Sequence, residues 1–194
     1  MEEELPPALA QKLSEEEGTD NERATVVART LMKESDRGCA IFGAAILHDD
    51  LERLFRAFFR NDEESIKHVI NPLFQGFAPL ATFSSRIQLA YAMGLISKDL
   101  KYRLDIVRRL RNDFAHESGP IDFDDVRCRD KLRILIADGK PPEKKDDSEP
   151  FMVGGQMLTR EQFVNRLAFI IAVSELTGRI RFLTGVAAGG KDMK

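Results

Sequence analysis

The chain has 194 residues, of which 43% are hydrophobic and 31% are charged, and this composition indicates one globular domain with a buried core rather than a disordered chain. Its 29 basic and 32 acidic side chains leave a net charge of −3. A protein that neutralises many phosphates by itself usually carries a basic excess, so we do not expect this chain alone to bind duplex DNA tightly.

Cysteine spacing and hydropathy indicate a protein of a reducing compartment. Cys39 and Cys128 form no CxxC pair, and no Cys/His cluster has the spacing of a zinc site. We therefore expect two buried free thiols, no metal and no cofactor. The amino terminus lacks a signal-peptide pattern, and the longest apolar stretch, residues 39–47, is too short to cross a membrane. The expected location is the cytoplasm, without a membrane contact.

The amino-terminal part predicts an arm and two helices. Residues 1–20 are acidic and contain two prolines, which predicts a loosely ordered arm. Apolar periodicity predicts helices over residues 21–33 and 35–60. The first half of the second helix is apolar nearly all round, which is typical of a buried central helix.

The middle of the chain predicts one short and two longer helices. A helix over residues 65–70 leads into a turn-rich connection that contains three helix-breaking sites, Asn71-Pro72, Gly76 and Ala78-Pro79. A helix over residues 83–93 is stopped by Gly94. Ser97 is a good N-cap for a helix that ends near His116.

The carboxy-terminal part predicts two further helices around a loop and a hairpin. A helix over 124–136, capped by Asp124 or Asp125, is followed by a charged loop over 138–150 and a small β-hairpin over 151–158. A capping box over 159–162 opens the last long helix, and a disordered tail over 187–194 follows it. The fold class is all-α. Residues 21–186 are expected to form a single multi-helix bundle.

Arg111 is the most informative single residue in this pattern. On a helical wheel it lies within the apolar face of its helix, between Val107 and Phe114. A buried guanidinium is costly unless it is paired and hydrogen-bonded, so we expect a structural ion pair with a carboxylate of the central helix. Asp50 borders the apolar stripe of that helix and is the first choice.

Arg108, Asn112 and His116 form a second, polar stripe on the same helix, each four residues apart. Such a stripe is usually solvated, and less often it is half of a site that a partner completes. His116 is in the last turn, where the helix dipole favours a cation, and the wheel points it away from Arg111. Neither a Ser/His/Asp set nor a glycine-rich phosphate loop is supported.

Three blocks of sequence in one order resemble the mannitol operon repressor family. They are D-R-G, G-A-A and D-D-L-E at 36–38, 43–45 and 49–52, P-L-A-T-F-S-S-R-I and A-Y-A-M-G-L-I at 79–87 and 90–96, and L-R-N-D-F-A-H at 110–116, continuing through Phe123. The resemblance covers roughly residues 34–136. It implies a cytoplasmic, all-helical bacterial regulator that has no helix-turn-helix and acts through a protein partner.

A shorter pattern resembles the HEPN superfamily, whose ribonuclease members carry an Arg, a polar residue, three to five residues and a His near a helix end. Arg111, Asn112 and His116 match it. The resemblance implies a composite site between two copies in a homodimer. There, His would move protons during attack of a 2′-hydroxyl on the adjacent phosphodiester, while Arg would stabilise the charge on phosphate.

Two functional hypotheses follow, beside the plainer one of a helical interaction domain. The first is a transcriptional regulator of the mannitol-repressor type that works by protein contacts and is not an enzyme. The alternative is a metal-independent ribonuclease or RNA-binding domain that uses Arg111, Asn112 and His116. The first is favoured because its resemblance covers more of the chain.

Overall fold

The computed structural model describes residues 23–59, 62–136, 149–153 and 155–189. These residues form a helix over 23–31 and then α2 (Asp36–Phe58), α3 (Glu63–Ser65), the π-helix η1 (Ile66–Ile70), the 3-10 helix η2 (Asn71–Phe74), α4 (Phe83–Ala92), α5 (Lys98–His116), α6 (Val126–Leu135), β1 (Phe151–Val153), β2 (Gln156–Leu158) and α7 (Arg160–Gly189). The fold is an all-α bundle with one small antiparallel hairpin, as the sequence predicts.

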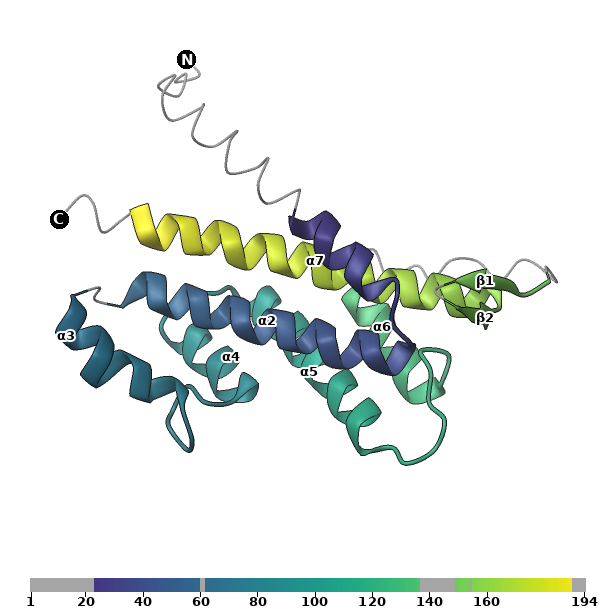
Figure 1. Ribbon diagram of the computed structural model, residues 1–194, viewed down its shortest axis with the longest axis horizontal. Coiled ribbons are helices and arrows are strands. Elements are labelled where there is room, and N and C mark those ends of the chain that lie inside the picture. The colour runs from purple at the N-terminus through teal and green to yellow at the C-terminus, as the bar shows by residue number, and fades with distance from the viewer. Residues whose placement is uncertain (1–22, 60–61, 137–148, 154, 190–194) are drawn as a thin grey trace, which may run out of the picture.

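The central helix is α2, and it packs along α7 on one side and against α4 and α5 on the other (Figure 1). Ser35 caps it by accepting a hydrogen bond from Gly38 N. Where α2 meets α7, Gly43 permits the close approach, because a Cβ there would lie 3.0 Å from the Phe169 ring and 3.1 Å from Val173 Cγ2. The small residues of this helix therefore set its distance to α7.

Local signals explain where the other helices begin. Ser97 accepts a hydrogen bond from Leu100 N at 3.2 Å and starts α5. The expected capping box opens α7, with Gln162 N donating to Thr159 Oγ1 and Thr159 N donating to Gln162 Oε1. Asp125 is the N-cap of α6, whereas Asp124 contacts Asn165 of α7.

Aromatic side chains join the end of α5 to α7 within the core. The Phe114 and Phe123 rings meet edge to face with centroids 5.0 Å apart, and Phe123 stacks on Phe169 at 4.9 Å. All three rings are fully buried. This cluster holds the loop between α5 and α6 against the bundle, and that loop is part of the candidate site.

The expected end of the last helix is wrong, and several other expected segments lie outside the described residues. The last helix continues through Gly189, so residues 187–189 are helical and do not belong to a disordered tail. Gly185 does not interrupt α7, because the helix passes through this position in regular helical conformation. The expected arm over 1–20, most of the loop over 138–150 and the rest of the tail lie outside the described residues.

Candidate functional site

Arg111 of α5 is half-buried. Its Nε atom is buried and has no hydrogen-bond partner among the described residues. Burial and then the Arg86 guanidinium lower the pKa of His48, and the Arg111 guanidinium acts in the same direction, which places it near His48 on α2. The side chain therefore faces the helix interface, but it is less enclosed than the sequence suggested.

The expected ion pair between Arg111 and Asp50 is wrong. Asp50 is 1% exposed, and its Oδ1 lies 3.1 Å from Arg53 Nη1 and 3.3 Å from Arg181 Nη2. Asp50 thus faces α7. The rotation of α2 relative to α5 and α7 decides this, and it cannot be read from the helical wheel of one helix. Burial raises the pKa of Asp50, while Arg181 and then Arg53 oppose the shift.

The other two motif residues lie apart from Arg111 in this chain. His116 is exposed in the last turn of α5, and Asn112 is half-buried. Five helical positions separate Arg111 from His116, a rotation of about 140°. The two side chains therefore project from different sides of α5 within one chain. Arg108, which shares the polar stripe, is bound instead through Nε to Asp105 at 3.2 Å.

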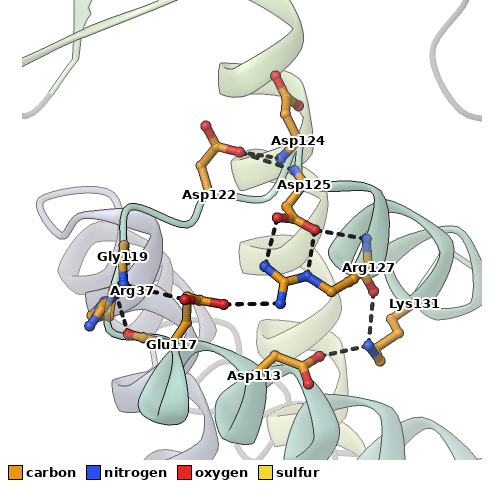
Figure 2. A network of polar contacts seen from close by, with 9 residues as sticks. All are labelled: Arg37, Asp113, Glu117, Gly119, Asp122, Asp124, Asp125, Arg127 and Lys131. Carbon is orange, nitrogen blue, oxygen red and sulfur yellow. Dashed lines mark hydrogen bonds and ion pairs between the residues drawn. The ribbon is translucent and has the colours of Figure 1, made fainter.

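The end of α5 and the start of α6 are joined by a charged network at this end of the bundle (Figure 2). Arg127 donates to Glu117 at 3.0 Å and forms a bidentate pair with Asp125 at 2.9 and 3.0 Å. The Arg127 hydrogen bonds lower the pKa of Asp125 to about 2. Lys131 pairs with Asp113 at 2.6 Å. The network fixes α6 against α5, and its charges are largely paired within the chain.

The loop between α5 and α6 is held from the start of α2. Arg37 donates through Nη2 to the carbonyl oxygens of Glu117 and Gly119, at 3.0 and 2.8 Å (Figure 2). Asp122 Oδ1 accepts from the backbone N–H groups of Asp124 and Asp125. These contacts fix the loop at the surface next to His116.

A buried ion pair ties this loop to the helices beneath it. Asp36, the first residue of α2, lies 2.5 Å from Arg166 Nε of α7, and the two residues are 6% and 2% exposed. The other Asp36 oxygen accepts from Phe123 N at 2.9 Å, and Arg166 Nη2 donates to Gln156 Oε1 of β2 at 2.8 Å. One pair thus joins four segments of the chain.

A different surface, on α7, is apolar. Ile171, Phe182 and Val186 are 58%, 60% and 59% exposed and fall on one face of the helix. We call these three residues the α7 stripe. A groove of about 540 Å³ lies beside Ile171, toward the helix over 23–31, and another of about 390 Å³ lies beside Phe182. Both grooves reach Gly178, and between Ile171 and Phe182 this face also carries the charged side chains Glu175 and Arg179.

Metal and membrane features are not found in the described ranges. No three His, Cys, Asp or Glu side chains there are placed to hold a metal ion. Nor does any helix in the described part have the length and hydropathy to cross a membrane. Cys39 and Cys128 are buried free thiols, as predicted, and burial raises the pKa of each to about 12.

The sequence interpretation missed the arginines that are most deeply buried. Arg86, Arg103 and Arg166 are 2%, 4% and 2% exposed. Arg86 binds Glu52 at 2.7 Å, and Arg103 binds Glu175 through two hydrogen bonds of 2.6 and 2.8 Å. The signal was present, because Arg103 precedes Val107 by four residues as Arg111 follows it by four.

Comparison with known proteins gives one consistent result. The family model described as mannitol repressor matches residues 25–181. Mannitol operon repressors of Escherichia coli strain K12 and of E. coli O6:H1 strain CFT073 are each 24% identical over 146 residues, which is 74% of this chain and 74% of theirs. The solved structure described as the MtlR–HPr complex from E. coli has a similar fold, with a TM-score of 0.67 and 20% identity over 81% of this chain and 97% of that one.

Proposed function

This chain belongs to the mannitol repressor family, and on that premise we propose that it is a transcriptional regulator that acts through contacts with another protein rather than by reading DNA itself. The observation that carries the proposal is the family match over residues 25–181, nearly the whole helical bundle. A protein of similar fold has been crystallised as an MtlR–HPr complex, which supports a protein partner. We propose HPr as that partner and the cytoplasm as the location.

The charge distribution supports the same mode of action. The chain carries −3 overall, and near the end of α5 the basic side chains Arg127 and Lys131 are engaged by carboxylates. Basic side chains that are already paired with carboxylates displace few counterions from DNA phosphates. They therefore contribute little to the binding of duplex DNA.

We place the partner's contact on the α7 stripe. Large apolar side chains that are more than half exposed on one helix face lose water-exposed area when a partner covers them. The two grooves that meet at Gly178 could receive apolar side chains from a partner, as helix and groove interfaces do. Glu175 and Arg179 lie between Ile171 and Phe182 on the same side of α7, where they would add polar contacts to the partner.

Calorimetric titration of the full chain with HPr from the same organism tests both statements. We expect micromolar or tighter binding, weakened roughly tenfold or more by Phe182→Ser or Val186→Ser, because truncated interface anchors often cost over 1 kcal/mol. Val69→Ser is the matched control, since Val69 is also 59% exposed but lies on η1. If the stripe variants bind HPr as tightly as the wild-type chain, the contact does not lie on the α7 stripe. No binding, together with nanomolar sequence-specific binding of duplex DNA, would overturn the proposed function.

A second candidate is the metal-independent ribonuclease or RNA-binding domain. The observation in its favour is that His116 is exposed, while Arg111 keeps a buried donor that has no partner in the described part of the chain. Because one chain holds the two apart, this function would require a homodimer that brings His116 of one copy toward Arg111 of the other. The proton of the attacking 2′-hydroxyl would pass to the His116 imidazole of one copy, and the protonated His116 of the other copy would give a proton to the departing 5′-oxygen as the bond between phosphorus and that oxygen breaks.

Incubation with single-stranded RNA in EDTA decides this candidate. Activity would yield 2′,3′-cyclic phosphate and 5′-hydroxyl ends, and His116→Ala would abolish it without changing the melting temperature. Arg111→Ala is a poorer variant because its side chain lies in the α2–α5 interface. Intact RNA after incubation with the wild-type chain would exclude cleavage, and no change in fluorescence anisotropy of labelled RNA would exclude binding.

A further inference from the structure

A polar cleft of about 360 Å³ opens where the start of α2, the loop before α6, β2 and the start of α7 meet. It is separate from the α7 stripe. Besides Ser35, the polar side chains that line its wall are Asp36, Arg37, Asp122, Gln156, Gln162 and Arg166. The volume is at the lower end of the range for small-molecule sites, so a ligand would be small.

The carboxylates in this wall already have hydrogen-bond donors. Asp36 accepts from Arg166 Nε through one oxygen and from Phe123 N through the other. Asp122 Oδ1 accepts from two backbone N–H groups, and its Oδ2 lies 3.3 Å from Gln162 Nε2. The acceptors are therefore largely satisfied before any ligand enters.

The donors in the wall are not satisfied to the same extent. Arg166 is 2% exposed, yet its Nη1 has no hydrogen-bond partner among the described residues. A buried guanidinium N–H without an acceptor is unfavourable, and Arg166 is one of the residues that line the cleft, so an acceptor that reaches Nη1 from the cleft would be stabilised. The Nε and Nη2 atoms are tied to Asp36 and Gln156, which holds the guanidinium in place.

Arg37 adds a second cation to the same wall. Its Nη2 is held by the carbonyl oxygens of Glu117 and Gly119, which orient the guanidinium but carry no formal charge to neutralise it. Two oriented guanidinium groups recognise carboxylate and phosphate oxygens, because they present several N–H donors in a plane.

We propose that this cleft binds the carboxylate or phosphate group of a small molecule, with Arg166 Nη1 and Arg37 as the donors. A neutral ligand would satisfy Nη1 but would leave the charge of Arg37 unused. Binding would bridge α2, β2 and α7, and so would tighten the hairpin onto the bundle. The site does not depend on the partner proposed for the α7 stripe.

The test is the melting temperature of the full chain in inorganic phosphate and, separately, in malonate, against chloride at the same ionic strength. A ligand that binds the folded state raises the melting temperature as its concentration increases. Stabilisation by phosphate alone or by malonate alone identifies which oxyanion the site takes. The ¹⁵Nε–H signal of Arg166 should shift along the same titration.

Two variants make the test specific. Arg37→Gln should weaken binding roughly 10- to 100-fold, as expected for loss of hydrogen bonds to a charged group. Gln156→Glu should abolish anion binding. The new carboxylate would pair with the Arg166 guanidinium and repel an anion, and the substitution should leave the fold intact. Arg127→Gln is the control, since Arg127 belongs to the same end of the bundle but does not line the cleft. No stabilisation by either anion, or equal stabilisation of all four proteins, would overturn the proposal.

Discussion

The buried pair between Asp36 and Arg166 gives the sharpest test of how this fold is held together. The Asp36→Asn substitution keeps the shape of the side chain but removes the charge that compensates Arg166. Because the two side chains are only 7% and 2% exposed, solvent would not screen the loss. Breaking one partner of a buried pair costs about 3–5 kcal/mol. For a chain of this size that lowers the melting temperature by roughly 6–20 °C.

Thermal melts followed by circular dichroism, with urea titrations at neutral pH, measure this effect. Asp49→Asn is the matched control on the same helix, because the Asp49 side chain is 70% exposed and its loss should change stability by less than about 0.5 kcal/mol. The double variant Asp36→Asn/Arg166→Met should recover part of the loss, since an apolar side chain leaves no uncompensated charge. If Asp36→Asn has the same melting temperature as Asp49→Asn, the pair does not hold the four segments together.

Three further predictions concern the packing and the ion pairs of the bundle. Gly43→Val should destabilise the chain by about 1–3 kcal/mol in urea titrations, because the new side chain would meet Phe169 and Val173, whereas Gly178→Ala, which has open space, should not. Hydrogen bonds from Arg103 lower the pKa of Glu175 from its ordinary value of 4.5, so its stabilising effect is complete above pH 4.5 and is lost as the pH falls through the folded pKa. The difference in urea midpoint between wild type and Glu175→Gln should therefore shrink from pH 7 to pH 3.5, and a constant difference would contradict the pair. Cys39 and Cys128, whose pKa values burial raises to about 12, should react with Ellman's reagent at pH 8 only after unfolding, and fast labelling of the native chain would show exposed thiols.

Local features of the bundle could be predicted from the sequence because they depend on neighbouring residues. Ser97 and the Thr159–Gln162 capping box mark helix starts through hydrogen bonds that span three residues. The Gly155 position, with a φ of 80°, allows the tight turn of the hairpin. The apolar all-round start of α2 likewise predicted its central place. Each of these signals lies within one segment.

The pairing of charges between helices was decided by the tertiary structure alone. The wheel of α5 marked Arg111 as a candidate for burial, but Asp50 is paired with Arg53 and Arg181, and the enclosed arginine of α5 is Arg103. Asp36 and Arg166 are 130 residues apart, and their contact depends on how α2 and α7 are rotated and shifted relative to one another. Helical periodicity identifies which face of a helix is buried. The packing of side chains such as Phe169 against Gly43 then determines which residue of the other helix lies opposite.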